Sequence, residues 1–574
     1  MKLKWTRARL DAAVVAALAF VIALGWALQN QFIGPQRIVD PLAYGGDAQL
    51  ALAAVAVGSR GEYLPFFSKL LPSLGAPFVA SWNDWPITED FLIFFLGGLA
   101  RLVGSAAGAI NLGFVVACMT GGASMFFVAR RYGARRENAA LAGLLFGLSN
   151  FIWARGVHHY GLIFVWSIPW NILVGSWLAS RRGIPFGSRR FLLAAAVTVG
   201  TGLGFIYYSF FTAQLYVLGT AAGAFRYGWS KRRFKPIFVL AFLLTAAIGS
   251  MHLDSALYII EHGRNGASIQ RAKSDAETYA LKPINFFAPG GNHRLEFMRT
   301  VSNRAAAQSV ISGEFPSPYL GMEAALALCA LGVFAMRLVA RGRTGLVVGW
   351  ASTALWLTLA HSTGGINSFL GLLDVRLFRS VNRVSVVVLA VALLFGTWWL
   401  GRLLAGKKPL VRWLVVAALG AFGVWEQLPM SDSPETIAAN RRAAESDRKL
   451  VAQMENALPH GAMVFELPVM DFPEVPPFGS VDSYEMFRPT LYARSLRFSH
   501  GDVKGRPNAG WKFRVASLPL PQMLQELRAA GFSALYVNRK GFPDGGAALV
   551  RELGVNGCRV IAEAELHDTL ALAL

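Results

Sequence analysis

Two aspartates in the first hundred residues are of a type and in a setting that could perform chemistry. Asp47 follows two glycines in Tyr44-Gly45-Gly46-Asp47, and Asp84 lies in Trp82-Asn83-Asp84-Trp85-Pro86. Glycines permit a tight turn that would direct Asp47 toward the membrane boundary. Partial burial raises the pKa of a carboxylate, which can then act as a general base. Asp47 is therefore a candidate general base. The alternative for Asp47 is a solvated loop residue or the cap of a helix over 48–57.

Three arginines form a second candidate group. Arg376, Arg379 and Arg383 are three and four residues apart in LDVRLFRSVNRVSV. On a helix this spacing places all three guanidinium groups on one face, and the guanidinium fork matches phosphate oxygens. The spacing therefore indicates a phosphate clamp. The alternative is that these residues snorkel at the end of a membrane span.

The remaining polar candidates are predicted to contact a sugar or an acceptor. They are His158 and His159 in a short turn, Glu261 and His262 after a later span, and Tyr484, Arg488, His500, Lys504 and Arg506 near the C-terminus. Aromatic faces with hydrogen-bonding groups suit sugar rings, although interfacial polarity or a charged domain surface would explain them equally well. Adjacent histidines cannot present both rings to one metal, so no metal site and no cofactor are predicted, while a divalent cation requirement stays open.

The elements that must position these groups are membrane helices. Of the 574 residues, 54% are hydrophobic and only 16% are charged, which excludes an ordinary cytosolic enzyme, because soluble domains carry about 25% charged residues. The net charge is 55 − 34 = +21. The basic residues form short clusters between apolar runs, as in the loops of membrane proteins, so nucleic acid is not a predicted partner.

The apolar runs predict about eleven transmembrane helices, from 12–28 to 411–426. Every short loop assigned to the cytoplasm is basic, which predicts a cytoplasmic N-terminus. The expected location is the bacterial cytoplasmic (inner) membrane. The predicted organisation is a multi-pass, mainly α domain over 1–430, with outer loops at 29–105, 253–319 and 361–384. A C-terminal α/β domain over 431–574 follows on the periplasmic or extracellular side. This domain is predicted to contain helices over 434–457 and 520–530 and strands at Met463–Leu467, Ala534–Val537 and Val560–Ala564.

Several of these motifs together resemble the GT-C glycosyltransferase superfamily. They are the first helix, the long first outer loop with an early Gly-Asp, the Trp-Pro turn, the apolar run Phe91–Val103 and the span that ends in Phe127-Val128-Ala129-Arg130-Arg131-Tyr132-Gly133. The superfamily includes protein mannosyltransferases, aminoarabinose transferases and YfhO-like proteins, and the resemblance covers 1–430. In the tail, Phe465-Glu466-Leu467-Pro468 and the stretch 499–506 resemble the outer domains of YfhO-like members.

The resemblance implies an inverting membrane glycosyltransferase. It would move a hexosyl or pentosyl group from a polyprenyl-phosphate donor to a glycan, lipid or protein acceptor at the outer face of the membrane. Asp47 matches the acidic residue of the family that deprotonates or orients the acceptor. Asp84 stands near the second acidic or His-Pro element of the family's first outer loop, which makes it the other predicted catalytic residue, although Trp85-Pro86 replaces the usual His-Pro-Pro. The arginine group would hold the lipid phosphate.

The alternative function is a transporter or flippase of lipid-linked sugars without covalent chemistry. Transporters place polar residues near the membrane midplane, whereas the spans here contain almost no Asp, Glu or Lys, which favours an enzyme at the membrane surface. A phosphoethanolamine-type transferase would need metal ligands at a spacing that the tail does not offer.

Overall fold

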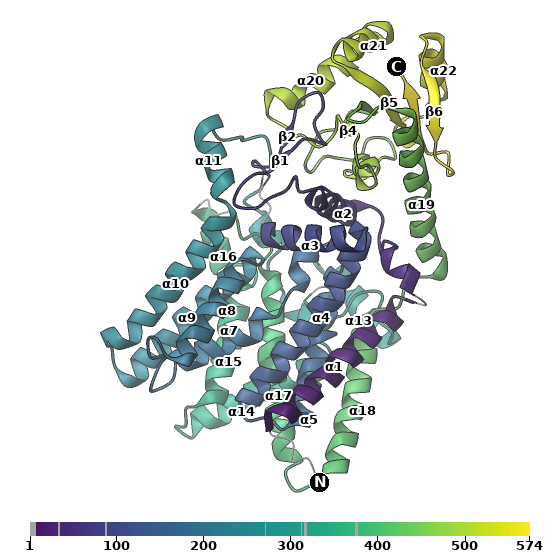
Figure 1. The fold of residues 1–574 in the computed structure, drawn as a ribbon. Coiled ribbons are helices and arrows are strands. Elements are labelled where there is room, and N and C mark those ends of the chain that lie inside the picture. The colour runs from purple at the N-terminus through teal and green to yellow at the C-terminus, as the bar shows by residue number, and fades with distance from the viewer. Residues whose placement is uncertain are drawn as a thin grey trace.

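The computed structural model describes residues 7–32, 35–85, 89–269, 271–311, 313–314, 318–373 and 377–574, except for the side chains of Pro35, Gln36 and Arg232. A bundle of helices makes up one end of the molecule, and a region with a small β-sheet makes up the other (Figure 1). The start of α1 and the turn between α17 and α18 lie at the bundle end, opposite the C-terminus. The arrangement confirms the mainly α membrane fold with a C-terminal α/β region.

The bundle contains the helices that match the predicted spans. They are α1 (Arg7–Gln29), α4 (Ala106–Arg131), α5 (Arg136–Gly147), α6 (Asn150–Arg155), α7 (Ser167–Leu178), α8 (Arg189–Gly202), α9 (Ile206–Tyr227), α10 (Lys231–Met251), α14 (Met322–Ala340), α15 (Leu346–His361), α17 (Ser385–Leu403) and α18 (Pro409–Gln427). Within the described residues, six helical stretches are long and apolar enough to cross a membrane: α1, α4, 233–251, α14, 381–403 and α18.

Two predicted spans differ in detail from the observed helices. The span expected over 137–153 is divided at Leu148 and Ser149 into α5 and α6, and the span expected over 160–179 begins with the 3-10 turn η2 (Tyr160–Ile163). Between α10 and α17 the chain also forms short helices outside the spans. They are α11 (Leu253–His262), α12 (Asp275–Thr278), α13 (Glu296–Ala307) and α16 (Ile366–Leu372).

Two helices of the first long loop lie across the C-terminal side of the bundle. They are α2 (Gly46–Ser59) and α3 (Asp90–Val103), and α3 crosses the upper end of α4 (Figure 1). The sequence of α2 consists mostly of small residues, which lets the two helices approach closely. A Cβ atom on Gly97 would lie 2.6 Å from the carbonyl carbon of Gly58. Between the helices, the short strands β1 (Leu70–Leu71) and β2 (Ala80–Ser81) pair antiparallel.

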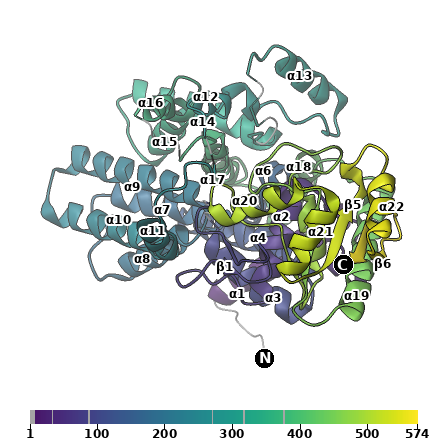
Figure 2. The same cartoon turned by 90° about the horizontal axis from the view of Figure 1, so that it is seen from above.

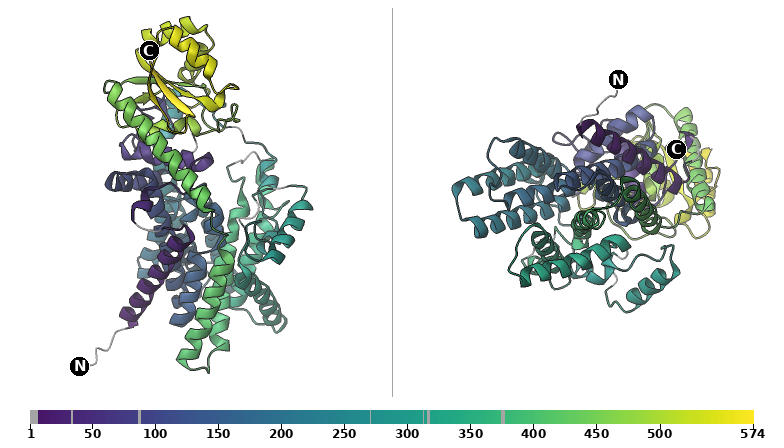
Figure 3. Two further views of the ribbon diagram at one scale, coloured as in Figure 1. Left: turned by 90° about the vertical axis from the view of Figure 1, so that its right-hand side faces the viewer. Right: turned by 90° about the horizontal axis from the view of Figure 1, so that it is seen from below.

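The C-terminal region begins with α19 (Pro434–Ala457), which rises from the bundle to the sheet above α18 (Figure 3). The sheet has the order β4-β3-β5-β7-β6, in which β3 is parallel to β4 and β5 while β7 is antiparallel to β5 and β6. Its members are β3 (Met463–Leu467), β4 (Arg497–Phe498), β5 (Phe532–Asn538), β6 (Arg559–Glu563) and β7 (Thr569–Ala573), with α20 (Pro507–Ala516), α21 (Leu520–Ala529) and α22 (Ala547–Val555).

The C-terminal region and the first long loop share one apolar core. Seen from above, this region covers the part of the bundle around α2, α3 and α4 and leaves α7 to α10 and α14 to α16 uncovered (Figure 2). Trp82 is fully buried, packs on Phe472 and Phe487, and donates its indole N–H to the carbonyl oxygen of Gly501 at 2.9 Å. The division at residue 430 stays a prediction, and the core formed by the two segments crosses it.

Candidate active site

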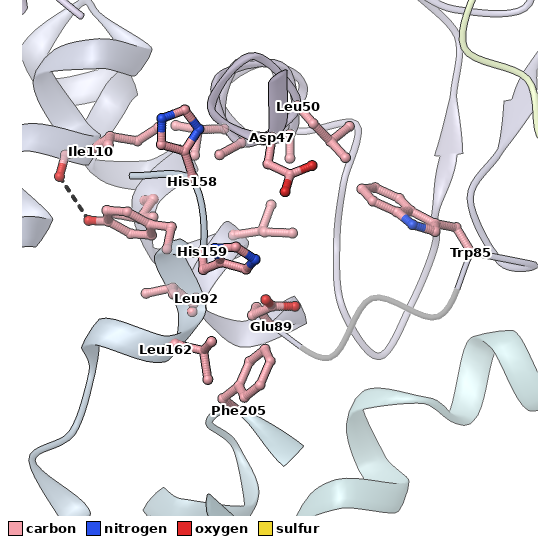
Figure 4. A pocket seen from close by; sticks show the side chains of 17 residues that line it. Asp47, Leu50, Trp85, Glu89, Leu92, Ile110, His158, His159, Leu162 and Phe205 are labelled. Carbon is pink, nitrogen blue, oxygen red and sulfur yellow. Dashed lines mark hydrogen bonds between the residues drawn. The ribbon is translucent and has the colours of Figure 1, made fainter. Parts of the chain in front are cut away.

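A cavity of about 200 Å³ lies between α2, α3 and the turn that follows α6. Four carboxyl or imidazole side chains line it, namely Asp47, Glu89, His158 and His159. Figure 4 shows the carboxyl groups of Asp47 and Glu89 pointing into the same space, with His159 beside them. The rest of the wall is largely apolar, with Leu50, Leu92, Leu162 and Phe205 among its members. An acidic and imidazole cluster thus faces an apolar chamber at the edge of the bundle.

Asp47 is held in the first turn of α2 by the C-terminal region. The N–H of Gly46 donates to Asp482 Oδ2 at 2.9 Å, so the Asp482 carboxylate caps this helix terminus. Two residues before the helix, the hydroxyl of Tyr44 donates to Asp447 Oδ2 at 2.6 Å. Gly46 has a φ of 53°, a left-handed conformation that favours glycine. The Gly-Gly-Asp pattern is therefore a tight turn that residues of the C-terminal region hold in place.

The chemistry of Asp47 is that of a carboxylate with reduced hydration. Burial raises the pKa of Asp47, and Coulombic attraction from His158 offsets part of this rise. Within the described residues, the Asp47 carboxylate makes no hydrogen bond or ion pair, so both of its oxygens remain available to a ligand in the cavity. A raised pKa and free oxygens are the properties that a general base requires.

Glu89 is the second acid of the cavity, and the sequence motifs did not identify it. It immediately precedes α3, whose first residue, Asp90, is fully buried and pairs with Lys69 Nζ at 2.7 Å. The hydroxyl of Tyr63 also donates to Asp90. These contacts fix the start of α3 and hence the Glu89 backbone. The Glu89 side chain lies against Gly161, where an added Cβ atom would be 2.3 Å from Glu89 Cγ.

The two histidines come from the turn between α6 and η2. Burial lowers the pKa of His159 to about 4, and the nearby guanidinium groups of Arg155 and Arg383 lower it further in the same direction. His159 is therefore neutral at pH 7 and has one donor and one acceptor nitrogen. The following residue, Tyr160, anchors the turn by donating its hydroxyl to the carbonyl oxygen of Ile110 at 2.9 Å.

Behind His159, two arginines bind one carboxylate. Arg155 Nη1 lies 2.6 Å from Glu314 Oε2, and Arg383 Nη2 lies 3.4 Å from Glu314 Oε1. The Arg383 guanidinium also packs over the ring of Phe205, a residue of the cavity wall, at 5.4 Å. Burial alone would raise the pKa of Glu314, but the two guanidinium groups outweigh it and hold this pKa at about 2. The pair of arginines thus forms an anion site next to the cavity, and Arg155 is a member that the predicted clamp lacked.

The predicted arginine clamp is only partly represented in this arrangement. Arg376 lies outside the described residues. Residues 377–380 have no helical structure and Val381–Val384 form a 3-10 turn, so the expected single α-helical face is not present in the described segment. Arg379 pairs with Asp275 at 3.4 Å and packs over the ring of Tyr279, whereas Arg383 points to Glu314.

Asp84 lies outside the cavity lining. Its carboxylate is almost fully buried and accepts two hydrogen bonds from Arg506, from Nε at 2.6 Å and from Nη2 at 2.9 Å. The amide of Asn265 donates to the same carboxylate at 3.2 Å. Asp84 and Arg506 therefore join the first loop, the third loop and the C-terminal region, while the neighbouring Trp85 lines the cavity.

The other predicted contact residues lie in separate places. Glu261 and His262 are exposed at the end of α11. Arg488 is buried in ion pairs with Asp447, Glu485 and Asp568, and His500 is buried with its backbone N–H bound to Glu466. Lys504 donates to the carbonyl oxygen of Glu474 at 3.1 Å. Burial raises the pKa of Tyr484, and the nearby negative charge of Asp47 raises it further, so Tyr484 lies within electrostatic reach of Asp47.

A second, more polar cavity of about 520 Å³ adjoins the first, and His158 lines both. Its wall includes Asn30, Asn150, Asn292 and Asp432. Among the described residues of the chain, no group of three or more His, Cys, Asp or Glu side chains is arranged to hold a metal ion.

Comparisons with known proteins concern the fold. No known family profile matches the sequence, and no curated protein does so. The arabinofuranosyltransferase AftD from Mycobacteria superposes with a TM-score of 0.51 at 14% identity, over 97% of this chain and 41% of that chain. ArnT from Cupriavidus metallidurans, solved with undecaprenyl phosphate, gives a TM-score of 0.47 at 12% identity, over 98% of this chain and 97% of that one. The Archaeoglobus fulgidus oligosaccharyltransferase gives 0.44 at 10%, over 92% and 70%.

The superposition on AftD covers nearly all of the present chain, although the chain spans only about two fifths of AftD. It agrees with the resemblance seen in the first loop and the early spans. The protein therefore has the fold of the GT-C glycosyltransferases.

Proposed function

We propose that this protein is an inverting membrane glycosyltransferase that takes its sugar from a polyprenyl-phosphate donor. The observation that carries the proposal is the convergence of Asp47, Glu89 and His159 on one largely apolar cavity with an arginine pair behind it. The reaction is placed on the membrane face that carries the C-terminal region, outside the cytoplasm of a bacterial cell.

The donor is assigned to the apolar cavity and the adjoining anion site. Apolar walls suit the first isoprene units, and Arg155 and Arg383 suit the phosphate, because charge-assisted bidentate contacts are strong and specific for phosphate oxygens. In the present structure Glu314 occupies the position of that anion between the two arginines. Neutral His159 adds a hydrogen-bond donor without adding charge.

The chemical step follows from this placement. Asp47 accepts the proton of the acceptor hydroxyl while the hydroxyl oxygen forms a bond to the anomeric carbon from the face opposite the phosphate. The bond between the anomeric carbon and the phosphate oxygen breaks, and its electron pair leaves with the polyprenyl phosphate. The arginines stabilise the charge that grows on the leaving phosphate. The products are the inverted glycoside, the lipid phosphate and a protonated Asp47.

The acceptor is assigned to the second cavity, which meets the first at His158. Its amide side chains are neutral hydrogen-bonding groups, which suit a polyhydroxylated glycan. Glu89 is proposed to bind hydroxyl groups of the transferred sugar, because it faces the same space as Asp47 from the opposite wall. Asp84 receives a structural role in this proposal, since Arg506 engages both of its oxygens.

The test is transfer by the purified protein in lipid nanodiscs. Polyprenyl-phosphate donors that carry different hexoses and pentoses would be supplied with envelope glycan fragments, and products would be identified by mass spectrometry. Release of polyprenyl phosphate together with an inverted glycoside is the expected result. Movement of intact donor across a vesicle membrane without cleavage would instead show a flippase and overturn the proposal.

A further inference from the structure

A cavity of about 730 Å³ on the far side of α2 carries a concentration of positive charge. It lies between the C-terminal ends of α2 and α3, the start of α4, and the C-terminal region at Arg448 and 491–494. Four arginines line it, namely Arg60, Arg101, Arg448 and Arg494, and its described lining contains no Asp or Glu. We refer to it as the arginine cavity.

Only one of the four guanidinium groups is fully engaged. Arg60 pairs with Glu62 at 2.9 Å and donates to the carbonyl oxygen of Thr490 at 3.0 Å. The guanidinium groups of Arg101, Arg448 and Arg494 make no ion pair or hydrogen bond with the described residues, although Arg448 packs over the ring of Tyr492 at 5.4 Å. Three cations therefore face one cavity without an anion.

The neighbouring carboxylates are occupied elsewhere. Burial raises the pKa of Asp40, and the nearby charge of Arg441, with which Asp40 pairs at 3.8 Å, offsets this rise more than that of Arg448 does. Glu455 accepts the backbone N–H groups of Arg494 and Ser495 at 2.6 and 2.9 Å. The charge of the arginine cavity is therefore left for a ligand, because like charges held together gain most from a shared anion.

The position of the cavity indicates where this anion comes from. One face of α3 exposes Phe91, Phe94, Phe95 and Leu102, the last with 86% of its surface accessible. A helix that lies across the end of a membrane bundle with such a face belongs in the boundary between headgroups and acyl chains. Arg101 is next to Leu102, so the arginine cavity opens beside the lipid-facing edge of α3.

We propose that the arginine cavity binds the phosphate-bearing headgroup of an anionic membrane lipid. Arg101, Arg448 and Arg494 would contact the phosphate oxygens, and the acyl chains would lie along the apolar face of α3. The cavity volume fits a complete headgroup rather than a bare anion. The proposal does not depend on sugar transfer, since the cavity shares no lining residue with the one that contains Asp47.

Native mass spectrometry of the full-length protein, purified from mixed nanodiscs, tests this site. The site variant combines Arg101→Gln, Arg448→Gln and Arg494→Gln. The control combines Arg514→Gln, Arg551→Gln and Arg559→Gln, which removes three exposed charges from the C-terminal region remote from α3. A basic residue at an anionic membrane contributes about fivefold in affinity, so three together contribute on the order of 100-fold.

Short-chain phosphatidylglycerol would be titrated onto each protein, with short-chain phosphatidylcholine and glycerol phosphate as the other ligands. The expected result is one phosphatidylglycerol bound per chain, weakened at least 10-fold in the site variant and unchanged in the control. Equal binding by both variants overturns the site. Equal binding of phosphatidylcholine overturns the anionic preference, and equal binding of glycerol phosphate overturns the lipid in favour of a soluble phosphate.

Discussion

Replacement of Asp47 by Asn separates catalysis from structure unusually well in this protein. The Asp47 carboxylate has no hydrogen bond or ion pair within the described chain, and Gly46, not Asp47, holds the α2 terminus through Asp482. The substitution therefore leaves no protein group without its partner. At pH 7 the ionised carboxylate is less stable in the folded cavity than in water, because its folded pKa is raised. Asp47→Asn should leave the unfolding temperature unchanged or slightly higher.

The expected loss of activity is large. A positioned general base contributes about 10²–10⁴-fold, or about 2.7–5.5 kcal/mol of barrier. Burial makes Asp47 a stronger base than an exposed aspartate, which places the effect in the upper half of this range, at roughly 10³-fold or more in kcat. The same burial sets the pH dependence. Activity should fall as pH drops through the raised pKa of Asp47, at a higher pH than for an exposed aspartate, because the protonated form accepts no proton.

The assay is single-turnover transfer in nanodiscs, with unfolding followed on the same samples. Glu89→Gln is the matched comparison, since it changes an acid of the same cavity that is proposed to bind sugar rather than to take a proton. It should raise the KM for the donor and retain the acidic limb of the pH profile, whereas Asp47→Asn should remove that limb. Parental kcat in Asp47→Asn, or an unchanged acidic limb, would refute the general-base argument.

Three further substitutions probe the supports of the cavity. Arg383→Gln should lower kcat/KM for the donor by about 10- to 150-fold, from the loss of one charge-assisted contact, and an unchanged donor titration would contradict the phosphate role. Arg488→Met should destabilise folding by about 3–5 kcal/mol, because it leaves Asp447 buried without its bidentate partner, as a thermal or denaturant curve would show. Asp84→Asn should lower the free energy of unfolding by about 3 kcal/mol, and not by more, since Arg506 keeps two backbone acceptors. The folded fraction should retain its kcat, and a selective loss of kcat would show that Asp84 is catalytic.

Local sequence patterns predicted five elements of the C-terminal region closely, namely α19, α21, β3, β5 and β6, but did not identify β4, β7, α20 or α22. The helix expected over 434–457 is α19, and the strand expected at Met463–Leu467 is β3 with the same bounds. Both are regular, with a Ser-Pro start in one and a buried apolar run in the other, so short-range periodicity suffices. The break between α5 and α6 was missed because its one local signal is Gly147, the last residue of α5, and a single glycine is common inside a transmembrane helix.

The candidate site could be predicted only in part, because its members meet through tertiary contacts. The Gly-Gly-Asp turn singled out Asp47, and the turn position singled out His158 and His159, but nothing in the spacing indicated that they line one cavity. Asp84 and Glu89 are only five residues apart, and the sequence does not show which of them lines the cavity. Asp84 is instead held in an ion pair by Arg506, a residue 422 positions away in the chain. Arg155 gave no signal beyond its place at a span end, since its partner Glu314 lies on another loop.

The contacts that hold Asp47 have a consequence for how the protein is made. Tyr44 and Gly46 leave the ribosome early, whereas their partners Asp447 and Asp482 follow 403 and 436 residues later. The membrane helices are synthesised in between, so a nascent chain that has already entered the bilayer still lacks the groups that fix Asp47, the proposed general base. The turn that holds Asp47 is therefore completed only by the last segment translated, and a chain that ended before Asp447 would enter the membrane without these contacts.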